Sequence, residues 1–589
     1  MNRLSNQPQV PVSKHKQDFD SYDLFPAFEL KKGEIKEGYF SLFEKIQTSK
    51  LLILDGYVGI DWKEITEAIS SYFTQKGIQL NLINSTDYYK TSSEIESMIA
   101  PYLGGDDPVF GTKTDLSLSD YVDSSLVNSI HVNSSVTTIV YGTGASLSGL
   151  KGVLVYFDLP KNELQYRMRA GAISNLASRE SKSPKQMYKH FFFVDWVICN
   201  KEKKRLLPEL DYIVDQQRSN HPTWMTGETL RNGLAGMSKS YFRVRPWFEP
   251  GVWGGHWMSE HFPELPQNEP NYAWSFEMIV PENGLIFSSD EVLSEVTFDW
   301  LMYQAGENVL GKAYRRFEDD FPIRFDFLDT FDGGNLSIQC HPSVEYAKTH
   351  FGEKFTQDET YYIIDTKPGA NVYLGFQETI DPGEFRKALE KSVESSTEID
   401  IKEFVQILPS VKHGFYLIPN GTIHSSGIDN MVLEISATPY IYTFKIYDWQ
   451  RLDLNGEPRP LNVDRAFENL DFTRKGEVVQ ETLISKPNTI DSGIDWEKVH
   501  LPTHPAHFYD VIRYEFDSEV TIPTDGQCHL LMLVEGDSLS LSTAHDQEVK
   551  FNYAETFAVP AASGSYRLKN LGSRRAKVII AFVKESACN

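Results

Sequence analysis

The chain has 589 residues, of which 41% are hydrophobic, 13% aromatic and 24% charged. This length and composition exclude a single small module and a disordered or collagenous chain, and they indicate three or four globular domains. The 57 basic and 82 acidic residues give a net charge of −25, which disfavours a nucleic-acid partner because a phosphate backbone would be repelled.

Two further features of the composition bear on location. The sequence has no run of about 18 uninterrupted apolar residues, so we expect no membrane association. The four cysteines are far apart and form no CxxC pair, which is typical of a protein of the reducing cytoplasm and gives no sign of a disulfide framework or a thiolate zinc site. The sequence leaves the oligomeric state open.

The first part of the chain predicts an α/β domain. Residues 1–36 are polar and irregular, so we expect a flexible segment there. Residues 37–218 alternate apolar runs with helical periodicity, which favours a parallel sheet. We expect a linker at 219–239. Within the domain, strands are expected at 51–54, 78–83, 137–141, 153–157 and 191–199, and helices at 62–73 and 163–178.

From about residue 240 the sequence pattern changes to short apolar runs separated by turns rich in Gly, Pro, Asn and Asp. This rhythm is typical of an antiparallel sandwich or barrel. We expect one β domain at 240–498, interrupted by a helical insertion at about 382–408, and a second β module at 499–589. The expected fold class is therefore multidomain, with an α/β part followed by an all-β part.

Four residues of the first β domain form a candidate metal site. Gln339 and His341 are two apart in a strand-like run and so face the same way. Glu359 opens an apolar strand, and His424 follows a turn. Two imidazoles, a carboxylate and an amide suit one divalent ion, Zn²⁺ first and Mn²⁺ or Co²⁺ as alternatives. The competing interpretation is that each histidine is an ordinary core or surface residue.

The motifs around these residues resemble, in order, those of class I mannose-6-phosphate isomerases. The resemblance spans about residues 240–584 and implies a pair of cupin-like β barrels, with Gln339, His341, Glu359 and His424 as metal ligands. It implies a cytoplasmic, metal-dependent aldose–ketose isomerase that interconverts mannose 6-phosphate and fructose 6-phosphate through a cis-enediol. The motifs are Gln339–Pro342, Glu359–Ile364, Ile418–His424, Leu433–Ile435 and Thr443–Asp448.

The resemblance also suggests roles for charged residues. Lys445 takes the place of the family's active-site arginine and is expected to be catalytic. Glu434 is the candidate acid/base by position; the alternative is a strand carboxylate paired with a neighbouring Lys or Arg. Arg324 or Arg451 could contact the substrate phosphate, and the alternative for each is a solvated strand charge.

Three departures from the family pattern weigh against turnover of a sugar phosphate. Lys445 keeps the positive charge of the arginine but lacks its planar fork. Gln357 stands where the family often has a lysine, and Asp326 aligns with a second family lysine. An unphosphorylated sugar is therefore an alternative substrate. The alternative function is a non-catalytic regulatory protein that binds a sugar or sugar phosphate.

Residues 37–218 show a weaker resemblance to the P-loop group of uridine kinase and phosphoribulokinase, carried by Gly56–Gly59, Ser85–Tyr89 and Asp106–Phe110. A working phosphate loop needs a lysine and a hydroxyl where this chain has Ile60 and Asp61. The resemblance therefore implies a degenerate, catalytically silent domain, for which we predict no nucleotide-binding residues. The nearby Tyr141-Gly142-Thr143-Gly144 is typical of a turn that ends a strand.

Overall fold

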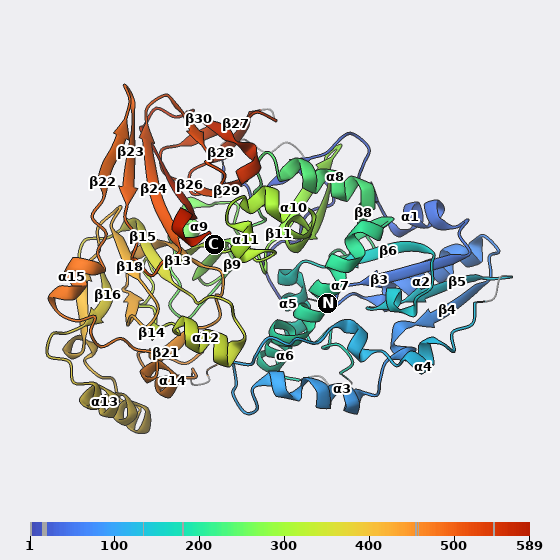
Figure 1. The fold of residues 1–589 in the computed structure, drawn as a ribbon, viewed down its shortest axis with the longest axis horizontal. Coiled ribbons are helices and arrows are strands. Elements are labelled where there is room, and N and C mark those ends of the chain that lie inside the picture. The colour runs from blue at the N-terminus through green and yellow to red at the C-terminus, as the bar shows by residue number, and fades with distance from the viewer. Residues whose placement is uncertain are drawn as a thin grey trace.

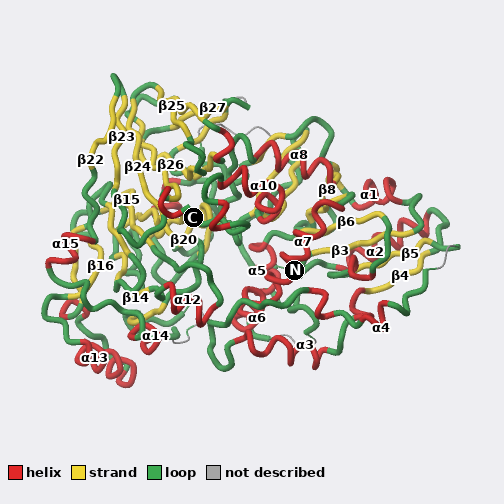
Figure 2. The backbone as a smooth tube through the Cα atoms, viewed as in Figure 1, coloured by secondary structure: helices red, strands yellow, loops and turns green. Residues whose placement is uncertain are grey.

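The computed structural model describes residues 3–14, 21–132, 135–178, 182–453, 456, 459–545 and 548–588. An α/β part and a larger β-rich part lie next to each other along the long axis of the molecule, as Figure 1 and Figure 2 show. The multidomain fold class expected from the sequence is confirmed. None of the described helices combines the length and the apolar character that crossing a bilayer requires.

The α/β part is built on a seven-stranded sheet whose five consecutive strands β4-β5-β3-β6-β7 run parallel, with β8 antiparallel at β7 and β2 beyond it. Its strands are β2 (Lys36–Glu37), β3 (Leu51–Gly56), β4 (Leu80–Asn84), β5 (Thr137–Tyr141), β6 (Val153–Asp158), β7 (Tyr212–Asp215) and β8 (Thr223–Thr226). Its helices are α1 (Tyr39–Ile46), α2 (Trp62–Gln75), α3 (Ser92–Ile99), α4 (Ser124–Val127), α5 (Lys161–Arg169), α6 (Pro184–His190), α7 (Trp196–Leu206) and α8 (Gly227–Met237).

Three expectations for this part are wrong. The apolar run 191–199 is helical: a π-helical turn at Phe191–Asp195 leads into α7. A short apolar run does not distinguish a buried strand from a buried helix, and here the run continues into a charged helical turn. The helix expected at 163–178 ends at Arg169. Residues 219–239 are not a linker, because they contain β8, which pairs with β7, and α8.

The N-terminal segment is not detached from the rest. Val10 and Tyr22 are buried, and β1 (Ala27–Glu29) pairs in parallel with β11 (Gly284–Ser289), which itself pairs with β12 (Val292–Thr297). In the described portion of residues 1–36, the expectation of a flexible segment is therefore wrong. The few apolar residues of this polar stretch are the ones that anchor it.

The first β domain consists of two facing antiparallel sheets of six and five strands, in the orders β18-β15-β20-β13-β10-β9 and β17-β16-β19-β14-β21. Side chains of both sheets interlock in one buried cluster. The strands are β9 (Trp247–Glu249), β10 (Trp274–Met278), β13 (Ile323–Asp329), β14 (Ile338–Cys340), β15 (Glu359–Thr366), β16 (Asn371–Phe376), β17 (Val405–Pro409), β18 (Phe415–Ile418), β19 (His424–Ser426), β20 (Asn430–Ala437) and β21 (Phe444–Tyr447).

The helical insertion is shorter than expected. The helix α13 spans Pro382–Ser395, but residues 405–408 belong to β17, so the predicted end of the insertion at 408 is wrong. The other helices of this region are short, apart from α10. They are α9 (Trp257–His261), α10 (Asp299–Leu310), α11 (Tyr314–Phe317), α12 (Val344–Phe351), α14 (Val463–Phe467) and α15 (Glu477–Thr482).

The C-terminal module is a second pair of sheets, in the orders β22-β23-β24-β31-β26-β29 and β25-β30-β27-β28. It begins at β22, ahead of the expected boundary at 499, because β22 and β23 pair with β24. Its strands are β22 (Asn488–Ser492), β23 (Trp496–Leu501), β24 (Tyr509–Phe516), β25 (Glu519–Pro523), β26 (His529–Glu535), β27 (Ser538–Thr543), β28 (Val549–Asn552), β29 (Thr556–Val559), β30 (Ser565–Asn570) and β31 (Ala576–Val583).

The two parts of the chain are joined at the carboxyl ends of the parallel strands. Asp158 ends β6 and accepts a hydrogen bond from the backbone N–H of Thr297 at 2.9 Å. Asp215 ends β7 and accepts one from the backbone N–H of Glu295 at 3.0 Å. In open α/β sheets this edge is the usual place for a ligand. Here β12 covers it at β6 and β7.

A buried ion cluster strengthens the same interface. The ammonium of Lys203 is 2.8 Å from Asp299 and 3.6 Å from Asp158, and its side chain is fully buried. Lys161 lies 3.1 Å from Asp299. Because charges away from water must be matched, these two lysines and two aspartates depend on one another. The interface also encloses a cavity of about 340 Å³, which is lined by Lys161 among others.

We predict that Lys203→Ala lowers the free energy of unfolding by about 3–5 kcal/mol, because it leaves two buried aspartates with one lysine. The measurement is urea denaturation followed by tryptophan fluorescence. Lys204→Ala is the matched control, since Lys204 is half-exposed and pairs with Asp319 at 2.5 Å. Lys204→Ala should lower the free energy of unfolding by no more than about 1 kcal/mol. Equal effects of the two substitutions would contradict the prediction.

Candidate metal and substrate site

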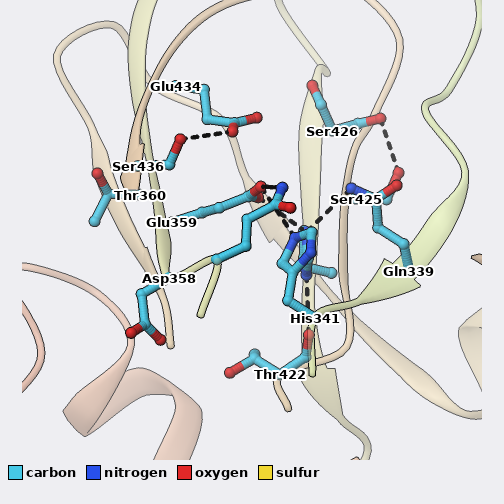
Figure 3. A network of polar contacts seen from close by, with 12 residues as sticks. Gln339, His341, Asp358, Glu359, Thr360, Thr422, Ser425, Ser426, Glu434 and Ser436 are labelled. Atoms are coloured by element: carbon cyan, nitrogen blue, oxygen red, sulfur yellow. Dashed lines mark hydrogen bonds and ion pairs between the residues drawn. The ribbon is translucent and has the colours of Figure 1, made fainter. Parts of the chain in front are cut away.

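Three buried side chains meet between the two sheets of the first β domain (Figure 3). His341 follows β14 and His424 opens β19 in the five-stranded sheet, while Glu359 opens β15 in the six-stranded sheet. His341 Nε2 is 3.0 Å from Glu359 Oε1, and His424 Nε2 is 3.3 Å from Glu359 Oε2. One ligand atom from each residue lies within 4.8 Å of the others. We call these residues the triad.

The hydrogen bonds of the two imidazoles leave their Nε2 atoms unprotonated. His341 Nδ1 is 3.1 Å from the carbonyl oxygen of Tyr442, and His424 Nδ1 is 2.9 Å from that of Thr422. A carbonyl only accepts, so each neutral ring carries its proton on Nδ1. Each Nε2 lone pair then faces the Glu359 carboxylate. Two lone pairs facing a carboxylate repel it unless a cation lies among them.

Burial sharpens this requirement. It lowers the pKa of His424, which opposes removal of the repulsion by protonation of the ring. The backbone carbonyls fix both rings in the tautomer that metal-binding histidines commonly adopt. The residues present therefore fit a divalent cation.

Gln339 and Gln357 complete the surroundings of the triad. Gln339 lies opposite His424 in the β14–β19 register, and its amide nitrogen is 3.3 Å from His424 Nε2. The four residues predicted as ligands are thus brought together. Gln357 donates a hydrogen bond of 2.6 Å to Glu359 Oε1. From the sequence, Gln357 was expected only to replace a family lysine, and its position two residues before Glu359 was the signal that it would lie beside the triad.

A charged network of the six-stranded sheet adjoins the triad. The register places Arg324, Ser436 and Glu359 in one row across β13, β20 and β15, and Asp326 and Glu434 in the next row. The Arg324 guanidinium is 3.3 Å from Glu359 and 3.8 Å from Asp326, and it also contacts Glu434 and Ser436. Arg324 is therefore held by carboxylates.

The charges of this network are unbalanced. Three buried carboxylates, Asp326, Glu359 and Glu434, face the single guanidinium of Arg324. Burial raises the pKa of Asp326 to about 7, although Arg324 opposes the shift. Burial, Asp326 and Glu359 together raise the pKa of Glu434 well above its usual range. These raised pKa values favour a proton on one of the three carboxyls, and a divalent cation at the triad would offset the remaining negative charge.

The other two predicted site residues lie on the opposite side of the triad. Lys445 on β21 is opposite Gln339 in the β14–β21 register, so both side chains lie on the same face of the five-stranded sheet. Arg451 lies beyond β21, where its guanidinium is 2.5 Å from Asp448. Lys445 is therefore a neighbour of Gln339 on this face, and Arg451 contacts the carboxylate that ends the Thr443–Asp448 motif.

In the α/β part, a carboxylate occupies the glycine-rich turn. Asp55 Oδ1 accepts from the backbone N–H groups of Gly56 at 2.7 Å and Gly144 at 2.8 Å, and Oδ2 accepts from that of Ser146 at 2.8 Å. Gly144 has a φ of +82°, which suits glycine and allows the turn to close on Asp55. Such clustered N–H groups commonly bind phosphate. Asp55 takes up these N–H groups here, and the absence of nucleotide-binding residues stays a prediction.

In comparisons with known proteins, the α/β part and the β-rich part match different proteins. A family described as a domain of unknown function, DUF8485, matches residues 38–239. Mannose-6-phosphate isomerase ManA of Bacillus subtilis is 22% identical over 328 residues, which are 55% of this chain and 94% of that protein. The Streptococcus mutans mannose-6-phosphate isomerase is 26% identical over 220 residues, which are 37% of this chain and 64% of that protein.

Among solved structures, the mannose 6-phosphate isomerase from Bacillus subtilis aligns with a TM-score of 0.47 and 21% identity, over 58% of this chain and 99% of that one. The curated relatives support an isomerase enzyme, and the similarity to ManA covers 55% of the chain. The kinase resemblance of the α/β part stays a prediction, since the family that matches there is one of unknown function.

We predict that His341→Ala weakens metal binding by more than about 100-fold, because loss of an inner ligand should exceed the loss of an outer-shell partner. The measurement is metal content of the purified protein by mass spectrometry, supported by a titration with Zn²⁺. His221→Ala is the control: His221 also pairs with a glutamate, Glu37 at 3.1 Å, but lies exposed on the α/β part. Full metal content in His341→Ala would contradict the assignment.

We also predict a pH dependence that originates at Asp55. Burial raises its pKa to about 6, with Glu202 adding to the shift. Between about pH 4 and pH 6 the folded protein keeps a proton that the unfolded chain loses, so Asp55 makes the fold less stable as the pH rises, by up to ~3 kcal/mol. Urea unfolding should show that Asp55→Asn gains stability relative to wild type between pH 4 and pH 7. If the free energies of unfolding of Asp55→Asn and wild type differ by the same amount at pH 4 and at pH 7, the prediction is contradicted.

Proposed function

We propose that the protein is a metal-dependent aldose–ketose isomerase that interconverts mannose 6-phosphate and fructose 6-phosphate. The observation that carries the proposal is the triad: two imidazoles whose tautomers expose Nε2 to one buried carboxylate. Two further observations support it: the triad lies within five motifs in the family's order, and Lys445 is beside it. Similarity to curated isomerases over more than half of the chain agrees with this.

The metal would be held by His341, His424 and Glu359, with Gln339 at the open side. When bound, it would stabilise negative charge on the oxygens of the open-chain sugar as the proton moves between C2 and C1. Zn²⁺ suits this set of nitrogen and oxygen donors, and Mn²⁺ or Co²⁺ are acceptable to it.

The protein's own residues would move and balance the proton. Glu434 is a buried carboxyl whose pKa is raised well above its usual range by burial and by Asp326 and Glu359, so it can hold a proton that an ordinary carboxyl would lose. Arg324 and Ser436 contact its carboxyl group and hold it in place. On the other side of the triad, the ammonium of Lys445 supplies a positive charge near the developing anion.

The alternative is a non-catalytic protein that binds a sugar or sugar phosphate. One observation favours it: Arg324, a candidate phosphate contact, is engaged by Asp326, Glu359 and Glu434. Such a protein would keep the metal and bind sugar without turnover.

A coupled assay of the full chain with mannose 6-phosphate separates the two. The protein is treated with chelator and then restored with Zn²⁺, Mn²⁺ or Co²⁺. We expect turnover that the chelator abolishes and a metal restores. Absence of turnover in protein shown to hold metal, with mannose and fructose 6-phosphate also tested, would refute the isomerase proposal.

For Lys445 we predict that substitution by Ala lowers kcat by about 100-fold or more, since it removes a preformed charge beside the reacting oxygens. Metal content should not change, because Lys445 is not a ligand. Lys445→Arg is the matched variant and should recover much of the activity, as it restores the side chain of the family motif. Parallel loss of metal and activity in Lys445→Ala would show a structural role instead.

A further inference from the structure

Lys445 has an ammonium group without a carboxylate partner. Of the residues that the structure describes, none accepts a hydrogen bond from its Nζ; the bonds of Lys445 involve its backbone and Asn462. Burial, with Arg459 close by, lowers the pKa of Lys445 to about 8. A half-buried cation of this kind is costly unless an anion meets it.

Two arginines converge on the same place. Arg451 and Arg459 both bind the carboxylate of Asp448, which is 4% exposed. Their own side chains are 20% and 12% exposed. One carboxylate neutralises only one of the two guanidinium groups, and Lys445 adds another positive charge. This is a local excess of two positive charges in a chain with a net charge of −25.

The α/β part adds a fourth cation. Lys185 lies on α6, and its ammonium is 3.3 Å from Asp453. It is close enough to Lys445 to contribute to the lowered pKa of that residue. The helix α6 is held against the β domain, because Tyr188 donates a hydrogen bond of 2.8 Å to the buried Glu282. Lys185 is thus presented to the β domain by an anchored helix.

We propose that Arg451, Arg459 and Lys185 bind the phosphate group of the substrate, with Lys445 between them and the triad, so that the α/β domain completes the isomerase site. This rests on the proposed function. A phosphate monoester carries nearly two negative charges at neutral pH, which matches the local excess of positive charge. Asp448 orients the two guanidinium groups, whose forks suit phosphate oxygens and supply the geometry that Lys445 lacks.

The location fits a substrate that spans both sites. Lys445 lies between Gln339, at the edge of the triad, and the arginines that bind Asp448. A sugar with its C1 and C2 at the triad would direct its far end toward this cluster. Asp326 and Gln357 replace the lysines of the family pattern. Asp326 lies on β13 of the six-stranded sheet, and Gln357 lies two residues before β15 of the same sheet. The positive charge is therefore supplied from the opposite side of the site.

The test uses full-length protein with Lys185→Ala, and Lys151→Ala as the matched control. Lys151 is an exposed lysine of the same domain that pairs with Glu209 at 3.4 Å. We expect Lys185→Ala to raise KM for mannose 6-phosphate about fivefold with kcat unchanged, as an exposed charge contributes modestly. Arg459→Ala should raise KM about tenfold or more. Inhibition by unphosphorylated mannose should be the same in all variants.

Two results would overturn the proposal. One is a KM of Lys185→Ala equal to that of Lys151→Ala. The other is an equal loss of affinity for mannose, which would point to a general disturbance of the site. If the wild type turns over no sugar phosphate, isothermal titration with inorganic phosphate still decides. Weaker phosphate binding by Lys185→Ala and Arg459→Ala than by Lys151→Ala supports the anion site, and equal binding refutes it.

Discussion

The candidate site depends on one interaction, the meeting of the Glu359 carboxylate with two imidazole Nε2 atoms. Each ring donates its Nδ1 proton to a backbone carbonyl, so its orientation is set by the strand or turn that carries that carbonyl. Glu359 comes from one sheet and the histidines from the other. A cation bound among them therefore ties the two sheets together and relieves the repulsion between lone pairs and carboxylate. Folding and binding of such a cation would be coupled for this reason.

Charged residues form two groups of opposite sign on the two sides of the triad. On the side of the six-stranded sheet, three carboxylates exceed the one guanidinium of Arg324. On the side of β21, two arginines and two lysines exceed the carboxylates that they contact. The first group suits a divalent metal and a proton transfer, and the second suits an anion. A sugar phosphate has both requirements in one molecule, as the proposed function needs.

In the proposed arrangement, the α/β domain takes part in the site through its position. Asp55 occupies the N–H groups of the glycine-rich turn, and β12 covers the ends of β6 and β7. The buried Lys203 cluster then fixes the domain against the β region. This docking brings Lys185 near Lys445.

The residues proposed as metal ligands were predicted from the sequence because their spacing carries information. Gln339 and His341 are two apart and share a face, and the family motifs supplied Glu359 and His424. The residues around these ligands could not be predicted, because their positions depend on strand register. Nothing in the local sequence places Arg324 in the same row as Glu359. The run at Phe191 was assigned to the wrong state, since a short apolar segment lacks a distinguishing period. The role of Lys185 depends on how two domains dock, which no local pattern encodes.

The most direct test of the account is X-ray absorption spectroscopy at the zinc edge on the full chain loaded with one equivalent of Zn²⁺. The account predicts that only nitrogen and oxygen atoms surround the zinc, at about 2.0–2.1 Å. Scattering from more distant imidazole atoms should correspond to two imidazoles in the wild type and to one imidazole in His341→Ala. A sulfur ligand, or a spectrum that His341→Ala and His424→Ala leave unchanged, would contradict it.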